Sequence, residues 1–182
     1  MKTTRLLLLF SSLILLFNAG CTYAMRYDGT YSGKVVDADT REPLEGVVVL
    51  GTWHTVIPTV AGGVSHYYDA RETMTDKNGE FSIPGMGLRI MSNLEPMHFM
   101  VFKAGYEYIG PALWVSLKVD MPFSKKIKWE GDKPVIPLKK LTMEERKKSG
   151  TFPPYPSTEA PKEKIKLMME EIYKERKERG LD

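Results

Sequence analysis

The sequence predicts an all-β fold, a seven-stranded antiparallel β-sandwich with a C-terminal helical extension. From Thr30 onward, short runs of β-forming residues are separated by turn residues about every 8 to 12 positions, and such punctuation is typical of antiparallel sandwiches. A helical period begins only near residue 141. The chain has 182 residues, of which 42% are apolar and 27% charged. This suffices for one hydrophobic core with appendages and is too short for a large two-domain enzyme.

The first twenty residues predict an export signal. Two basic residues lie in Met1–Arg5, positions 6–17 are almost wholly apolar, and small residues precede Cys21. This order of charged, apolar and small residues is that of a secretory signal. The apolar run has about 12 residues, whereas a helix that crosses a bilayer needs roughly 20. We therefore expect residues 1–20 to be cleaved off.

Two cleavage sites are possible, and they differ in whether the mature protein keeps Cys21. Ala19-Gly20-Cys21 resembles a bacterial lipobox, in which the cysteine becomes the first residue and carries two or three acyl chains, enough for durable membrane binding. The alternative is ordinary cleavage after Ala24, which would discard the cysteine. Cys21 is the single cysteine, so an intrachain disulfide is excluded. We expect lipidation at Cys21 and a tether over residues 21–29. By the same resemblance, Thr22 after the cysteine implies the outer membrane of a bacterial envelope, on its periplasmic or surface face.

Without the signal, the charges of the chain are nearly balanced. Lys2 and Arg5 fall in the signal, which leaves 24 of the 26 basic residues against 23 acidic ones. A net charge near +1 argues against the basic footprint of a nucleic-acid-binding protein. We therefore expect no nucleic-acid partner.

Two strands are predicted before residue 51. Tyr31–Asp37 is the first, and Asp39–Pro43 follows as a turn, because Asp and Thr side chains bond to nearby amides and proline fixes its own φ. Leu44–Leu50 is the second strand. Its three consecutive valines indicate burial on both faces.

Five further strands follow. The clearest pattern is a hairpin whose strands, residues 72–75 and 80–84, flank the turn Asp76–Gly79, where Asn78-Gly79 can supply positive φ. The next strand, Met97–Lys103, leads to a turn at Gly105. The last two β-like segments are residues 113–119 and 134–138.

Four short motifs occur in a defined order along the first part of this domain. They are Gly33–Asp37, Pro43–Val49, Thr75–Phe81 and Lys103–Tyr106. Together they resemble the carboxypeptidase regulatory-like domain over about residues 30–110, within a predicted domain of residues 30–140. The resemblance implies a transthyretin-like sandwich that accompanies catalytic, transport or adhesive modules and has no active site of its own. The stretch Gly51–Asp69 is longer than that pattern, and added surface sequence is where a scaffold can gain its own function.

This long stretch contains the candidate ligand-binding residues. A tip of small residues, 61–63, lies between aromatic and imidazole side chains, which offer planar surfaces with polar edges to a glycan or peptide. The other interpretation is that the rings pack within the sandwich, as aromatic residues in strands commonly do. The candidates are Trp53, His54, His66, Tyr67 and Tyr68.

The sequence does not predict an enzyme. A catalytic zinc site needs about three clustered ligands, and none of the three histidines, His54, His66 and His98, lies in an HxxE or HExxH motif. A metal-dependent hydrolase would require at least two of His54, His66, Asp69 and Glu72 to converge. Motifs of serine hydrolases and nucleotide-binding loops do not occur in the sequence. We therefore expect no metal and no cofactor.

Residues 141–182 predict a charged helical tail. Thr142 and Glu145 have the spacing of a capping box, which predicts a short helix that ends by Gly150. The Pro-rich segment 152–156 is an extended spacer. A second helix is predicted over residues 159–179, with an apolar stripe at spacings of 3 and 4. The stripe consists of Ile165, Met168, Met169 and Ile172.

The stripe on the second helix has two interpretations. It can pack on the sandwich, or it can dock a partner, since a Met-rich stripe adapts to varied surfaces. Between Lys162 and Asp182 there are 7 basic and 6 acidic residues, so attraction to anionic lipid is weak.

The expected function is non-catalytic. We expect an envelope lipoprotein that presents a structural or interaction module at the membrane. Its partners would be the membrane, through the lipid on Cys21, and another envelope protein or a glycan.

Overall fold

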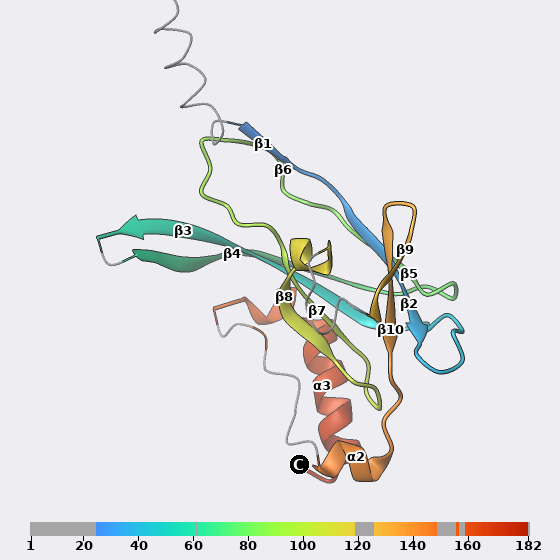
Figure 1. Ribbon diagram of the computed structural model, residues 1–182. Coiled ribbons are helices and arrows are strands. Elements are labelled where there is room, and N and C mark those ends of the chain that lie inside the picture. The colour runs from blue at the N-terminus through green and yellow to red at the C-terminus, as the bar shows by residue number, and fades with distance from the viewer. Residues whose placement is uncertain (1–24, 61, 119–125, 149–155, 157–158, 182) are drawn as a thin grey trace, which may run out of the picture.

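The computed structural model describes residues 25–60, 62–118, 126–148, 156 and 159–181. The predicted signal, Cys21 and most of the Pro-rich segment lie outside these described residues. Within them, ten strands form three sheets, and helices follow at the C-terminal end (Figure 1). The elements are β1 (Met25–Asp28), β2 (Tyr31–Asp37), β3 (Val48–Thr59), β4 (Gly62–Met74), β5 (Glu80–Ile83), β6 (Gly87–Ile90), β7 (His98–Phe102), β8 (Ile109–Leu113), β9 (Lys128–Glu130), β10 (Lys133–Leu138), α2 (Met143–Lys148) and α3 (Lys166–Glu178).

The two larger sheets form the predicted sandwich. Their strand orders are β5-β2-β10-β9 and β4-β3-β7-β8. The core between them takes fully buried side chains from both sheets, among them Val35, Ile136 and Phe99. The three valines of the second predicted strand are buried on both faces, as expected: Val47 and Val49 in this core, Val48 on the opposite face. The all-β sandwich with a C-terminal helix is therefore confirmed.

The strands differ from the prediction in number and in one direction. The described residues contain ten strands instead of seven: β1, β6, β8 and β9 were not predicted, and the strand predicted over residues 113–119 does not form. β10 pairs with β2 in parallel, with Val135 opposite Lys34. Parallel neighbours need a long crossover, and here the chain makes it through the whole second sheet. The expectation of a wholly antiparallel sandwich is thus corrected at this one pair.

The folded domain begins earlier than the predicted tether allows. Met25–Asp28 forms β1, which pairs antiparallel with β6. The buried carboxylate of Asp28 accepts hydrogen bonds from Trp53 Nε1 (2.9 Å) and the Met86 amide (2.8 Å). It also accepts one from the Tyr31 hydroxyl. These bonds fix β1 to β3 and to the β5–β6 connection, so β1 belongs to the domain.

The predicted hairpin around residues 76–79 is instead a corner between the two sheets. The turn itself is as tight as expected: the Gly79 amide donates to the Asp76 carbonyl (2.8 Å), and Gly79 has a φ of 73°. However, β4 pairs with β3, and β5 pairs with β2. The local turn chemistry was predictable, whereas the strand partners depend on the distant sheets.

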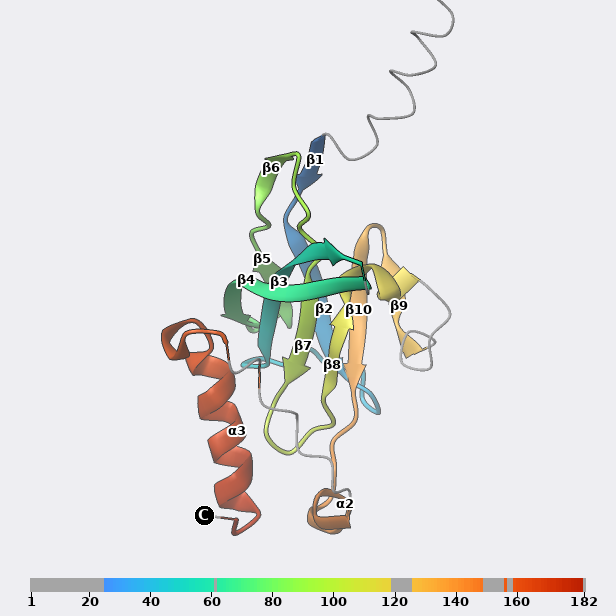
Figure 2. The same cartoon turned by 90° about the vertical axis from the view of Figure 1, so that its left-hand side faces the viewer.

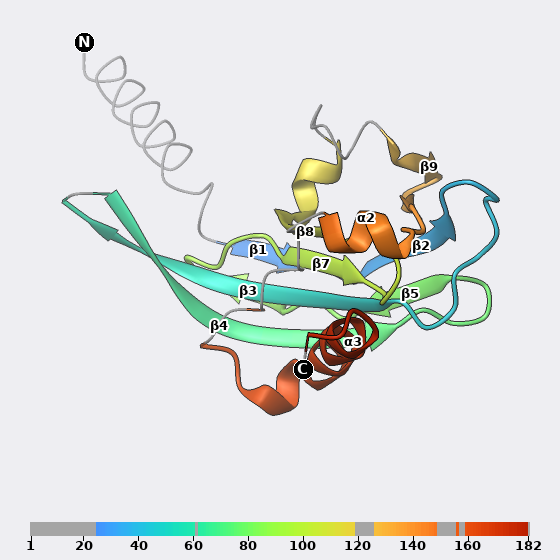
Figure 3. The same ribbon diagram turned by 90° about the horizontal axis from the view of Figure 1, so that it is seen from below.

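The long stretch after Gly51 continues the sheet as an extended hairpin. β3 and β4 pair from Val48 opposite Met74 to Thr59 opposite Gly62, with one bulge after Trp53. The additional residues therefore lengthen two strands that project beyond the sandwich (Figures 1 and 3).

The predicted strand over residues 113–119 is also corrected. β8 ends at Leu113, and Trp114–Lys118 forms a 3₁₀ turn. In this turn the Trp114 ring lies edge-on to Tyr31 and to Phe99, with ring centroids 5.4 Å apart in each pair. The tryptophan thus closes one end of the sandwich core.

The second helix of the tail packs on the outer face of sheet β4-β3-β7-β8 (Figures 2 and 3). Ile165, Met168 and Ile172 of the predicted stripe are buried there. Glu72 of β4 accepts hydrogen bonds from the Leu167 and Met168 amides (2.7 and 3.0 Å), which satisfies free amides at the start of the helix. Of the two interpretations of the stripe, packing on the sandwich is the one that the structure shows.

The short helix α2 has the predicted capping box. The Glu145 amide donates to Thr142 Oγ1 (3.2 Å), and the Thr142 amide donates to Glu145 Oε2 (2.9 Å). A hydrogen bond from Lys139, followed by those from Thr142, lowers the pKa of Glu145 to about 2. The next residue, Arg146, donates from Nε to Glu175 Oε1 of α3 (2.9 Å), and both side chains are buried. This ion pair joins the two helices of the tail.

Candidate functional site

A row of ring side chains crosses the outer face of sheet β4-β3-β7-β8 next to the start of α3. His54 on β3 lies opposite Tyr67 on β4, and His98 on β7 lies opposite Thr52, which shares a face with His54. The ring centroids of His54 and His98 are 5.0 Å apart, and those of His54 and Tyr67 are 6.4 Å apart. Three neighbouring strands therefore each place one ring in the same row.

The segment before β7 adds a carboxylate to this row. Its backbone runs beside β3, where the Glu95 amide donates to the His54 carbonyl (2.8 Å) and the Val56 amide donates to the Asn93 carbonyl (3.0 Å). Glu95 Oε2 lies 3.7 Å from His98 Nε2, too far for a hydrogen bond. One ligand atom from each of His54, Glu95 and His98 lies within 4.8 Å of the other two. Within the described part of the chain, no other group of three or more His, Cys, Asp or Glu side chains is placed to hold a metal ion.

Three polar atoms in the row are buried without a hydrogen-bond partner. They are His54 Nδ1, His98 Nε2 and the Tyr67 hydroxyl. A buried polar atom without a partner costs about 1–3 kcal/mol, and folded proteins contain few of them. Burial, followed by the neighbouring His98, lowers the pKa of His54. Burial and the neighbouring imidazole thus disfavour the protonated, cationic form of His54.

Of the two interpretations of the ring residues, Trp53 follows the one in which the ring packs within the sandwich. It alternates with His54 along β3, so its side chain points into the sandwich. There it is completely buried, and its Nε1 atom donates to Asp28. Its ring is part of the core and has no surface to offer a ligand.

The other predicted ligand-binding residues lie at the surface of the long hairpin. Tyr67 is half-buried in the row just described, whereas His66 and Tyr68 are exposed. The guanidinium of Arg89 lies over the Tyr68 ring, 4.7 Å from its centroid. The five predicted residues therefore separate into the core, the outer face and the exposed hairpin.

The residues predicted for a hydrolase do not converge. His66 lies opposite Thr55, on the other face of the hairpin from His54. Asp69 forms ion pairs with Lys164 and Arg71, and Glu72 binds the start of α3. Sequence reasoning missed Glu95 and His98, because their approach to His54 depends on the pairing of β3 with β7. The one local signal was that His98 alternates with Met100 and Phe102, which lie on the α3 side of the sheet.

A second surface is the ribbon formed by β1 and β6. Its register places Met25 opposite Ile90 and Tyr27 opposite Leu88, so these four side chains share one face. Each is more than half exposed. Arg26 and Asp28 lie on the opposite face, where Arg26 donates to the Leu94 carbonyl (2.8 Å). The ribbon thus has one apolar, solvent-exposed face, and it lies at the opposite end of the molecule from α2 (Figures 1 and 2).

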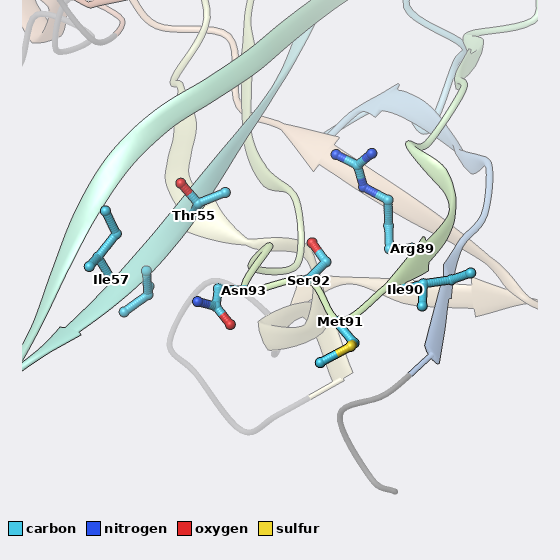
Figure 4. A pocket seen from close by; sticks show the side chains of 8 residues that line it. Thr55, Ile57, Arg89, Ile90, Met91, Ser92 and Asn93 are labelled. Atoms are coloured by element: carbon cyan, nitrogen blue, oxygen red, sulfur yellow. The ribbon is translucent and has the colours of Figure 1, made fainter.

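An open groove of about 370 Å³ separates this ribbon from the long hairpin. Figure 4 shows side chains of β3 on one side and of β6 and the turn that follows it on the other. Its apolar members Ile57, Ile90 and Met91 are exposed. The lining residues are Thr55, Val56, Ile57, Arg89, Ile90, Met91, Ser92 and Asn93.

Comparison with known proteins assigns no family. No family model matches the chain, and the search of curated proteins returned no match. Among solved structures, the chain is similar to a streptococcal ancillary pilin, with 14% sequence identity and a TM-score of 0.27. The match covers 63% of this chain and 30% of the pilin chain. A similarity this weak identifies neither the fold nor the function of this chain.

Helices long and apolar enough to span a bilayer are not found among the described residues.

Proposed function

We propose that the chain is a non-catalytic envelope lipoprotein whose β-sandwich is held against a membrane by acyl chains on Cys21. The observation that carries this proposal is the exposed apolar face of the β1–β6 ribbon. β1 begins only four residues after Cys21. Four residues span at most about 14 Å, so an acylated Cys21 would keep this ribbon close to the lipid headgroups.

The arrangement gives the sandwich a membrane end and a free end. An exposed apolar face of several large side chains is unusual on a soluble monomer and typical of a contact surface. Tyr27, six positions after Cys21 in the sequence, has the apolar body and polar tip that suit the membrane interface. The helix α2 lies at the other end, and α3 runs along the side of the sandwich towards that end (Figure 2), where an envelope partner could reach them.

We further propose that the sandwich belongs with carboxypeptidase regulatory-like, transthyretin-like domains. The support is the ordered set of motifs in residues 33–106, together with the turns that they form. Gly79 has the positive φ that its motif requires, and Gly105 does as well, with a φ of 87°. On this interpretation the domain is a scaffold without an active site.

Mass spectrometry and fractionation test the lipid anchor. The mature protein recovered from membranes of its native host should begin at Cys21 and carry the added mass of two or three acyl chains. A Cys21→Ala variant should leave the membrane fraction while its sandwich stays folded, because the core lies beyond residue 25. Recovery of a chain that begins at Met25 without lipid would refute the anchor.

A second experiment tests the apolar ribbon separately. In the lipidated protein, Tyr27→Ser with Ile90→Ser should make the β1–β6 ribbon more accessible to protease on membranes. Val115→Ser, at another exposed apolar side chain, is the matched control and should have no effect. If protease reaches the ribbon equally well in the wild type and in the double variant, the ribbon does not contact the membrane.

A second candidate function is recognition of a glycan or peptide by the long hairpin. The groove in Figure 4 favours it, because the exposed His66 and Tyr68 lie on the hairpin that forms one wall. His66→Ala with Tyr68→Ala should then abolish binding to a glycan or peptide array. A Trp53→Phe variant is the control and should bind the array as the wild type does, because Trp53 lies in the core.

A further inference from the structure

We propose that His54, Glu95 and His98 form a binding site for a divalent transition metal, with Zn²⁺ as the preferred ion. The site lies on the outer face of the sheet and is independent of the lipid anchor. Two imidazoles and one carboxylate are the ligand set of many three-ligand zinc sites, in which water takes the fourth position. Imidazole and carboxylate ligands disfavour Ca²⁺, which binds six to eight oxygens.

The geometry needs only small side-chain movements to hold the ion. Ligands of a tetrahedral zinc ion lie about 2.0–2.2 Å from the metal, so their atoms must be roughly 3.3–3.6 Å apart. The 3.7 Å between His98 Nε2 and Glu95 Oε2 already approaches this value. All three ligand atoms lie within 4.8 Å of one another. Rotation of half-exposed side chains can close the remaining distance.

The backbone holds the three ligands in a fixed relation. His54 and His98 lie on directly paired strands, and a hydrogen bond of 2.8 Å joins the Glu95 amide to the His54 carbonyl. The ligands therefore come from two strands and an adjoining segment, and rigid elements hold sites more precisely than loops do.

The polar atoms of the row give an independent reason to expect a bound ion. His98 Nε2 and His54 Nδ1 are buried and accept no hydrogen bond. A metal ion bound to such a nitrogen would remove the free-energy cost of burying it without a partner. Glu159, whose carboxylate accepts a hydrogen bond from the Tyr67 amide (3.2 Å), adds negative charge near His54. The surroundings therefore favour a cation.

A titration with Zn²⁺ alone tests the site. The full chain, extracted into detergent and stripped of metal with a chelator, should bind one Zn²⁺ per chain in competition with a chromophoric chelator. Mutation of residues that merely support a ligand typically weakens metal binding by 10- to 100-fold. His54→Ala and His98→Ala should therefore each weaken binding by roughly 100-fold or more. Co²⁺ in place of Zn²⁺ should give the strong visible absorption of a four-coordinate site.

His66→Ala is the matched control, because His66 is an exposed histidine on the neighbouring strand outside the cluster. It should leave Zn²⁺ affinity unchanged. Glu95→Gln keeps the size of the side chain and removes one charge, so it should weaken binding while circular dichroism stays unchanged. An equal loss in the His66→Ala variant, or a wild-type chain that binds no Zn²⁺, would overturn the proposal.

Discussion

The outer face of sheet β4-β3-β7-β8 has two halves of opposite character, although the same strands build both. Under α3, the side chains of β3 and β7 are apolar and sealed by the helix, as shown by Leu50, Phe102 and Ile172. Four residues after Leu50 on β3, and four residues before Phe102 on β7, the same face carries His54 and His98. There polar ring atoms are buried without partners.

The two halves should contribute differently to the stability of the fold. The half under α3 buries apolar surface, which is the dominant favourable contribution to folding. The imidazole half contributes little of that kind and leaves polar atoms unsatisfied, which is costly. Local departures from good packing are expected where a protein binds something. Substitutions in the two halves should therefore have very different effects on stability.

The largest effect is expected at the ion pair that joins α2 to α3. Arg146→Ala leaves Glu175 buried without its cation, and breaking a buried pair in this way typically costs about 3–5 kcal/mol. The free energy of unfolding, measured by chemical denaturation, should fall by that amount. Lys148→Ala removes an exposed ion pair with Glu144 and should cost less than about 1 kcal/mol. Equal losses in the two variants would show that burial does not strengthen the ion pair between Arg146 and Glu175.

A slightly smaller loss is expected from the apolar stripe of α3. Ile172→Ala removes a completely buried side chain, and such truncations cost about 2–4 kcal/mol. Protease should also cleave the tail faster, because α3 would separate from the sheet more often. Tyr173→Ala, at the exposed neighbour, should change neither quantity. If Ile172→Ala is as stable as Tyr173→Ala, the helix does not depend on this face.

On the inner side of the sandwich, the hydroxyl of Tyr31 has a hydrogen-bond partner. The Tyr31 hydroxyl donates to the Asp28 carboxylate, and a bond to a charged group contributes roughly 1.5–3 kcal/mol. Tyr31→Phe should lower the free energy of unfolding by that amount at neutral pH. The denaturation midpoint of the two proteins measures it.

The same tyrosine should make stability depend on alkaline pH. Burial, followed by the bond to Asp28, raises the pKa of Tyr31 from 10.0 to about 12. The folded state therefore favours the protonated phenol. This contribution is fully present below about pH 10, the pKa of the unfolded chain, and is lost as the pH rises towards 12. The advantage of the wild type over Tyr31→Phe should shrink in that window, and a constant difference would show that Tyr31 does not titrate with unfolding.

The sequence allowed accurate prediction where the signal is local. The strand Tyr31–Asp37 has the predicted bounds, the Thr142 capping box forms as expected, and the turn at Gly79 adopts positive φ. Each of these depends on residues within a few positions of one another. The pairing of β4 with β3 and of β5 with β2 depends on the whole fold, so the predicted hairpin became a corner.

The candidate site was predictable only in part for the same reason. Trp53 and His54 are neighbours on one strand, so alternation requires that they face opposite sides. Nothing in the local sequence indicates which of two adjacent ring residues points inward. The Trp53 side chain points inward and donates to the buried carboxylate of Asp28, which lies 25 positions earlier. His98 and Glu95 join His54 only through the register of β3 with β7.

The smallest effect should come from the tyrosine in the imidazole half. The Tyr67 hydroxyl is buried without a partner, so Tyr67→Phe removes a polar atom that gains nothing from folding. Removing it should leave the free energy of unfolding within about 0.5 kcal/mol of the wild type, or raise it by up to about 1 kcal/mol. Denaturation of Tyr67→Phe beside Tyr31→Phe makes the comparison directly, because the chemical change is identical. A loss in Tyr67→Phe as large as that in Tyr31→Phe would mean that the hydroxyl has a partner in solution. The contrast between the two halves of the face would then rest on the imidazoles alone.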